Sequence, residues 1–112
     1  MKPERKVFCL ERETAWEPMF PGLVRQILGY DNQIMVVKMK AEKGAAAPVH
    51  AHFHAQSTYV ASGKFEFTVG DRTQIVGPGD GIYVEPNARH GFVCLEPGII
   101  VDNFSPMRED FV

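Results

Sequence analysis

The sequence has no long hydrophobic run, only two cysteines and almost no excess of charge of either sign. No stretch of about 18 apolar residues occurs, so we expect no membrane-spanning helix. Glu11 and Glu13 interrupt the N-terminal region before the apolar segment of a signal peptide can form. We therefore expect a cytoplasmic protein.

The near-neutral charge also bears on partners, because the formal net charge is -2. Phosphate backbones require a clustered basic surface, so we expect no nucleic-acid partner. Cys9 and Cys94 could pair in principle, but two isolated cysteines without an export signal are usually reduced and packed. A chain of 112 residues has room for one domain, which we place at residues 1–112.

Long helical periodicity is also missing, and short β-type runs replace it from Gln33 onward. Turn residues separate these runs about every ten residues, which is typical of an all-β sandwich or barrel. In the run 64–69, Phe65 and Phe67 share one face while Lys64 and Glu66 share the other. This alternation predicts a half-buried strand.

The short connections predict how these strands follow one another. Ser62-Gly63 stands between two apolar runs, so we expect a hairpin there and a β meander overall. The first thirty residues show no clear pattern and are hard to place in a single sandwich of this size. We therefore expect a homodimer.

Three of the four histidines lie close together at positions 50, 52 and 54, and the fourth is His90. Residues i and i+2 of a strand project from the same face, so His50 and His52 can reach one metal ion. The same alternation would place His54 on that face too, if the strand extends as far as residue 54. Surface histidines can also cluster by chance, so His-x-His alone is a weak signal.

The spacing around the histidines is more specific. It resembles the first cupin motif, G-x5-H-x-H-x3-E-x6-G, through Gly44, His50, His52, Gln56 and Gly63. Gln56 stands where the motif usually has glutamate. The resemblance implies a single-domain cupin, a jelly-roll (double-stranded β-helix) sandwich.

A second cupin motif is similar to the segment from Gly79 through Pro86 to His90. The gap between the glycine and the proline is longer than usual, and Cys94 replaces the motif's asparagine. In this motif a histidine on a later strand completes the metal site. The two resemblances together imply four metal ligands: His50, His52, Gln56 and His90.

Those ligands imply one divalent transition metal, and Zn, Ni, Fe and Mn all accept imidazole and amide oxygen. Because Gln56 is neutral, the ion keeps its full charge, favours anionic oxygen ligands and acts as a Lewis acid. The alternative is that Gln56 fails as a ligand and the site binds metal poorly.

The C-terminal residues 102–111 read D-x-F-S-P-M-R-E-D-F. Alternation alone predicts a last strand followed by a packed tail. Together with His-x-His-x3-Gln and the later histidine, this ending resembles the KdgF family of pectin-degradation cupins, which linearise unsaturated uronates. The likeness runs through nearly the whole chain, including residues 62–70.

The resemblance implies a small anionic sugar substrate. The reaction would open 4,5-unsaturated monouronates, released by pectin or alginate lyases, into linear 4-deoxy-5-keto uronates without a redox cofactor. Asp102 would move a proton, Arg108 would suit the substrate carboxylate, and Phe104 would shape the pocket wall. His54 and Gln74 have no assigned role.

Two other functions are compatible with a cupin fold. One is a metal-dependent oxygenase, although Gln56 disfavours an iron site with a facial carboxylate. The other is a non-catalytic sugar-sensing module. Such modules are commonly fused to a DNA-binding domain, for which we expect no room after the sandwich.

Overall fold

The computed structural model describes residues 5–112, which form ten strands and two short 3-10 helices. Six strands build the larger sheet: β1 (Glu17–Phe20), β2 (Leu23–Tyr30), β3 (Met35–Ala41), β5 (Ala55–Val60), β8 (Gly81–Val84) and β10 (Gly98–Ser105). Four strands build the smaller one: β4 (Ala46–His50), β6 (Lys64–Val69), β7 (Arg72–Val76) and β9 (His90–Glu96). The helices cover Glu11–Glu13 and Glu109–Phe111.

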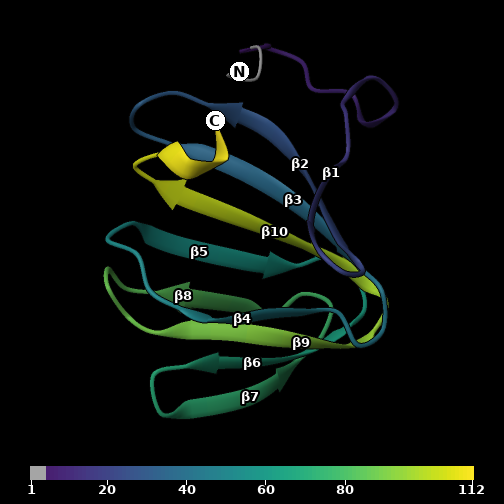
Figure 1. The fold of residues 1–112 in the computed structure, drawn as a ribbon, viewed down its shortest axis with the longest axis vertical. Coiled ribbons are helices and arrows are strands. Elements are labelled where there is room, and N and C mark those ends of the chain that lie inside the picture. Colours follow the sequence, from purple (N-terminus) through teal and green to yellow (C-terminus); the bar gives the residue numbers. More distant parts are fainter. Residues whose placement is uncertain (1–4) are drawn as a thin grey trace.

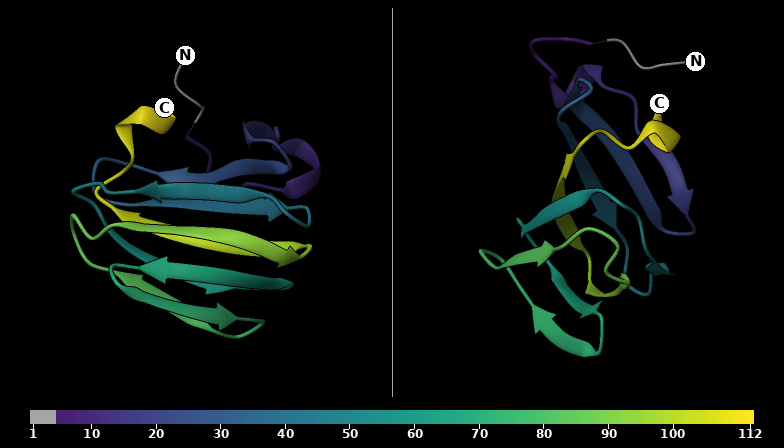
Figure 2. Two further views of the ribbon diagram at one scale, coloured as in Figure 1. Left: turned by 60° about the horizontal axis from the view of Figure 1, so that its bottom comes forward. Right: turned by 90° about the vertical axis from the view of Figure 1, so that its left-hand side faces the viewer.

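The two sheets pack face to face as an antiparallel sandwich (Figures 1 and 2). The larger sheet has the order β1-β2-β3-β10-β5-β8 and the smaller one β4-β9-β6-β7. Sequence neighbours such as β9 and β10 therefore lie in different sheets. The all-β class and the jelly-roll sandwich are confirmed.

The expected meander is wrong, and so is the hairpin at Ser62-Gly63. The chain crosses there from β5 in the larger sheet to β6 in the smaller one. Gly63 has a φ of 83°, and a Cβ on it would lie 2.6 Å from the Cα of Gly98. Two sheet-crossing connections thus touch at this point, so glycine is required here by a close backbone approach rather than by a hairpin turn.

The core lies between the sheets and follows the predicted alternation. Phe65 and Phe67 are buried while Glu66 between them is exposed. Phe65, Ile100 and Phe104 are among the largest fully or nearly fully buried side chains. Burying each such side chain contributes roughly 1.5–3 kcal/mol. Burial of these side chains therefore stabilises the packing of the two sheets against each other.

Residues 11–30 have a place in the same sandwich, while residues 1–4 lie outside the described part of the chain. The strand β1 pairs with β2, and Glu17 lies opposite Arg25 in the register. On the other face of β2, the buried Gln26 donates to the carbonyl oxygens of Glu11 at 3.1 Å and Thr14 at 2.8 Å. The difficulty of placing this region, on which the homodimer rested, is therefore removed, and the homodimer stays a prediction.

Two further expectations concern the cysteines and membranes. Cys94 is buried, Cys9 is partly buried, and both are free thiols. The expectation of unpaired, packed cysteines is thus met. Within residues 5–112 none of the helices is long or apolar enough to cross a membrane.

Candidate metal centre and catalytic pocket

Three histidines meet at one end of the sandwich. His50 ends β4 and His90 begins β9, and antiparallel pairing places the two directly opposite each other. His52 lies beyond the end of β4, in the connection to β5. One ring nitrogen from each histidine lies within 4.8 Å of the others. The predicted convergence is confirmed, but its reason is wrong because His50 and His52 do not share a strand.

Backbone carbonyls orient the three rings. Each Nδ1 lies near a carbonyl oxygen two residues away: Pro48 at 2.8 Å for His50, His54 at 3.2 Å for His52 and Ala88 at 2.9 Å for His90. A carbonyl only accepts, so each Nδ1 carries the hydrogen and each Nε2 keeps a lone pair. Metal-ligating histidines are typically held in this way.

Gln56, on β5, is buried and faces the same centre. Its Nε2 donates to Thr58 Oγ1 at 2.9 Å, which directs its Oε1 to a point 3.1 Å from His52 Nε2. A neutral imidazole has one hydrogen, yet both nitrogens of His52 face oxygen acceptors. A bound cation would satisfy the two facing lone pairs.

The donor set therefore fits a divalent transition metal, with three imidazole nitrogens and one amide oxygen. The cluster of His50, His52 and His90 indicates a divalent metal site. Gln56 as the fourth ligand stays a prediction. The pKa of His52 is lowered to about 4, with burial the largest cause and the positive charge of Arg108 the next. The pKa of His90 is lowered too, chiefly by burial, so both rings are neutral near pH 7.

A hydrogen-bonded chain links this centre to Asp102. Thr58 Oγ1 accepts from Gln56 and donates to Asp102 Oδ1 at 2.6 Å. Asp102 lies on β10 directly opposite Thr58 on β5. Burial raises the pKa of Asp102 to about 6, against the opposing effects of the Thr58 hydrogen bond and the Arg108 charge. This carboxyl group therefore titrates close to neutral pH.

Arg108 and Phe104 lie beside Asp102 in the same cavity. The Arg108 side chain is 11% exposed, and its Nε and Nη2 donate to the two carboxylate oxygens of Asp110 at 3.0 and 2.7 Å. This hydrogen bond is the main reason why the pKa of Asp110 is lowered. The Arg108 guanidinium carbon lies 5.3 Å from the ring centroid of Phe104 and 4.4 Å from that of Phe111.

His54 lies outside the metal cluster. Because β4 ends at His50, His54 lies outside that strand, and the alternation of side chains along a strand does not apply to His54. Its ring is buried, its Nε2 lies 3.0 Å from the carbonyl oxygen of Met107, and its buried Nδ1 has no partner within residues 5–112. His54 thus contacts the backbone just before Arg108. Gln74 is exposed on β7 and does not line the cavity.

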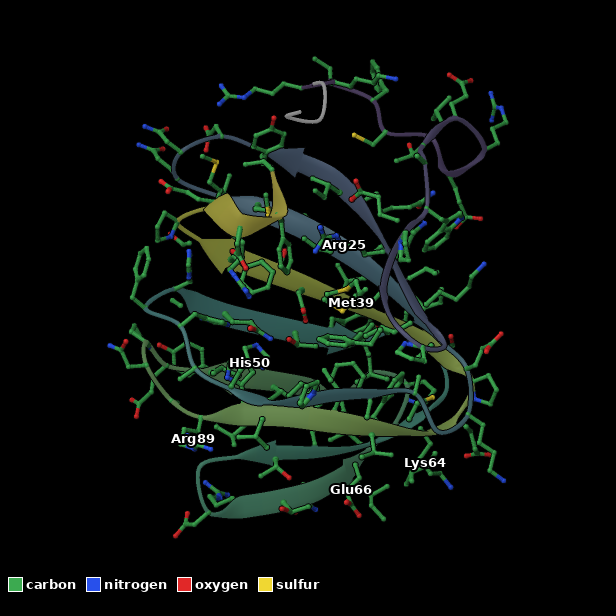
Figure 3. The ribbon with its side chains drawn as sticks, in the orientation of Figure 1. Arg25, Met39, His50, Lys64, Glu66 and Arg89 are labelled. Carbon is green, nitrogen blue, oxygen red and sulfur yellow. The ribbon has the colours of Figure 1, made fainter. Side chains whose placement is uncertain are left out.

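The cavity has a volume of about 410 Å³ and receives side chains from both sheets and from the C-terminal residues. Figure 3 labels three of its residues: Arg25, Met39 and His50. The predicted site residues that line it are His50, Gln56, His90, Asp102, Phe104 and Arg108. The structure thus brings together side chains far apart in the sequence.

Three residues near the site were missed by the sequence analysis: Arg25, Thr58 and Phe111. Thr58 had a usable signal, because it shares the parity of Gln56 on β5 and is a polar residue in an inward position. Arg25 had none, since its strand was not recognised. Phe111 lines the cavity from the helix Glu109–Phe111, which no periodicity could reveal.

An antiparallel two-sheet sandwich with a histidine cluster at one end defines a cupin. The family model described as the cupin domain matches residues 37–102. An RmlC-like cupin from Shewanella frigidimarina NCIMB 400 has the same fold, with a TM-score of 0.93 and 42% identity over 96% of both chains.

Two further relatives define the family more narrowly. KdgF from Halomonas sp. superposes with a TM-score of 0.91 and 33% identity, covering 96% of this chain and 99% of that one. The pectin degradation protein KdgF of Dickeya dadantii (strain 3937) is 36% identical over 94% of this chain and 97% of its own length. The chain belongs to the KdgF family of cupins.

Proposed function

We propose that the protein catalyses the ring opening of 4,5-unsaturated monouronates to linear 4-deoxy-5-keto uronates. One observation carries the proposal: Asp102, a buried carboxyl group with a pKa of about 6, shares a cavity with Arg108 and with His50 and His90 of the histidine cluster. Proton transfer is most efficient when the pKa of the acid or base lies near the working pH. Membership of the KdgF family, whose named relative acts in pectin degradation, supports this substrate class.

The reaction is an isomerisation in which one proton moves. The hemiacetal hydroxyl at C1 loses its proton as the C1–O5 bond breaks, and C1 becomes an aldehyde. The electron pair of that bond stays on O5, giving an enolate across C4 and C5. Protonation at C4 then yields the 5-keto product, so atoms and electrons balance without an oxidant.

In this scheme the proton transfer is assigned to Asp102. Its carboxylate can accept the C1 hydroxyl proton and return it to C4, and Thr58 holds one carboxylate oxygen in place through the 2.6 Å hydrogen bond. Such a transfer contributes typically 10²–10⁴-fold in rate. A divalent ion held by His50, His52, Gln56 and His90 would stabilise negative charge on a substrate oxygen.

Arg108 and Phe104 are assigned to binding. The guanidinium of Arg108 places positive charge beside Asp102, where an anionic substrate and its enolate gain stabilisation. The ring of Phe104 forms part of the apolar wall between β10 and the C-terminal residues. Excluding water from this wall strengthens the electrostatic contacts inside the cavity.

The direct test follows the ultraviolet absorbance of a 4,5-unsaturated monouronate in D2O, with and without the metal-loaded protein. We expect the chromophore to disappear faster than in buffer, with deuterium incorporated at C4 of the product. The matched control is the double variant His50→Ala and His90→Ala, which lacks two of the cluster's ligands.

The same experiment separates the competing functions. Loss of the chromophore at the background rate would refute the isomerase. Consumption of O2 with an oxidised product would indicate an oxygenase instead. Tight binding of the uronate without turnover would indicate a sensing module.

A further inference from the structure

Arg25 brings a second guanidinium into the cavity, on a strand whose role the sequence did not reveal. Its side chain is 16% exposed and lines the same cavity as Asp102 and Arg108. Its Nε donates to Glu17 Oε1 at 3.3 Å. Its two Nη groups have no hydrogen-bond acceptor within the part of the chain that the structure describes, residues 5–112.

The two arginines of the cavity differ in what they can still bind. A carboxylate is held most strongly by two parallel N–H groups of one guanidinium. Arg108 already gives such a pair to Asp110, at 3.0 and 2.7 Å. Arg25 keeps its Nη1–Nη2 edge for another anion.

The ring of Phe111 places the two arginines at one subsite. The guanidinium carbon of Arg25 lies 4.0 Å from its centroid and that of Arg108 lies 4.4 Å from it. Stacking on an aromatic face fixes the plane of a guanidinium and so pre-orients its donors. Phe111 thus brings both guanidinium groups to one end of the cavity, where the Nη1–Nη2 edge of Arg25 is the one left for an anion.

We propose that Arg25 is the carboxylate-binding residue of the cavity and selects uronates over neutral sugars, which rests on the proposed function. In Figure 3, Arg25, Met39 and His50 follow one another across the molecule, and all three line the cavity. A sugar ring bound over Met39 would direct its carboxylate to Arg25 and its reacting oxygens toward the histidines.

Substituting Glu17 distinguishes a binding role of Arg25 from a structural one, because the two roles predict opposite changes in substrate binding. Glu17 and Arg25 are cross-strand partners, so their ion pair could serve only to join β1 to β2. In that case Glu17→Gln and Arg25→Met would lower substrate binding and melting temperature equally. If Arg25 binds the substrate, Glu17→Gln removes a competing carboxylate and leaves binding intact or stronger.

The experiment measures calorimetric binding of galacturonate, a saturated uronate that cannot react, and of neutral galactose to the metal-loaded protein. We expect wild type to prefer galacturonate, and Arg25→Met to weaken its binding by about tenfold or more while galactose binding stays the same. Arg25→Lys should recover only part of the loss, and Glu17→Gln should bind at least as well as wild type. Arg72→Met, an exposed substitution on β7, controls for the lost net charge.

Turnover and metal content complete the test. For the unsaturated uronate, Arg25→Met should raise KM with little change in kcat, because the contact is made equally in ground and transition states. Metal content should equal that of wild type. Unchanged KM and unchanged galacturonate binding in Arg25→Met would overturn the inference, as would equal losses of binding and melting temperature in Glu17→Gln and Arg25→Met.

Failure of the proposed function gives a different result. If wild type binds galacturonate through Arg25 but does not convert the unsaturated uronate, the isomerase is wrong and the carboxylate subsite stands. If wild type converts the uronate and Arg25→Met has an unchanged KM, the subsite is wrong and the isomerase stands. If wild type neither binds nor converts a uronate, both are refuted.

Discussion

Gln56 and Asp102 show how single side chains set the charge of the site. The amide of Gln56 presents its oxygen to the histidine cluster and its nitrogen to Thr58. The single hydroxyl hydrogen of Thr58 is therefore free to reach Asp102. A neutral residue at position 56 thus affects both the charge at the cluster and the hydrogen bond that holds Asp102.

Substituting Gln56→Glu should separate metal affinity from catalysis. The carboxylate is a better ligand, so the variant should bind metal at least as tightly. It would also place a negative charge about 5 Å from the substrate anion, a repulsion of about 3 kcal/mol at an effective dielectric near 20. Even half of that lowers the rate more than tenfold. In addition, Thr58 cannot donate to both carboxylates.

The measurements are metal content, metal affinity and kcat/KM for the unsaturated uronate. Gln74→Glu on β7 adds the same charge at an exposed position outside the cavity and should behave as wild type. Equal turnover by the Gln56→Glu variant and wild type would show that the amide does not tune the charge of the site.

Asp102→Asn should change how stability depends on pH. In the folded protein the pKa of Asp102 is about 6, above the unfolded value of about 3.9. Between these two values the native state binds more protons than the unfolded state, so Asp102 lowers stability as the pH rises from about 4 to about 6. Above about pH 6 its unfavourable contribution is constant. Asparagine removes this contribution and still accepts from Thr58.

The test compares urea unfolding of metal-free wild type and Asp102→Asn from pH 4 to pH 8. The free energy of unfolding of the variant, minus that of wild type, should increase from pH 4 to pH 6 and then level off. The other ionisable groups are the same in both proteins, so their effect cancels in the difference. A difference that does not vary with pH would show that Asp102 has an ordinary pKa.

At the scale of elements, the buried side chain of His54 contacts the C-terminal residues after β10. His54 contacts the carbonyl oxygen of Met107 at 3.0 Å, and Arg108 is the next residue. The neighbouring Phe111 ring lies 5.9 Å from that of Phe104 on β10. His54 therefore positions the segment that carries Arg108, without itself lining the cavity.

His54→Phe keeps the ring but removes this hydrogen bond. We expect kcat/KM to fall by about tenfold, since a lost buried hydrogen bond costs roughly 1–3 kcal/mol. Metal content should not change. If His54 acts through Arg108, adding His54→Phe to Arg108→Ala should cost little further activity, as a double-mutant cycle would measure. Additive losses would contradict this coupling.

At the scale of the whole molecule, the candidate ligands connect the two sheets. His50 and His90 belong to the smaller sheet, while Gln56 belongs to the larger one. An ion held by all of them would join the two sheets at this end of the sandwich. Metal binding should therefore stabilise the fold as well as support the reaction.

Chelation should lower the melting temperature of wild type by about 5 °C or more, since ligand at 100 times its dissociation constant stabilises by about 2.7 kcal/mol. The double variant His50→Ala and His90→Ala should carry no metal, against about one ion per chain in wild type, and should not respond to the chelator. Elemental analysis and thermal unfolding measure both effects. Unchanged metal in the double variant would place the site elsewhere.

Much of the site could be predicted from the sequence, because its residues stand in short motifs with restrictive spacing. The segment from His50 to Gln56, the later His90 and the ending from Asp102 to Arg108 indicated the metal cluster and the pocket. Alternation likewise predicted which side of β6 is buried. The burial pattern follows from the period of a strand, whereas the site residues were implied by the resemblance to the cupin motifs and to the KdgF family.

The tertiary structure decided what depends on contacts between distant segments. It showed that His50 meets His90 through the pairing of β4 with β9, and that His54 contacts Met107 instead of the cluster. It also brought Arg25 to the ring of Phe111. No local pattern encodes these contacts, because turn residues signal where a strand ends but not which sheet the chain enters next.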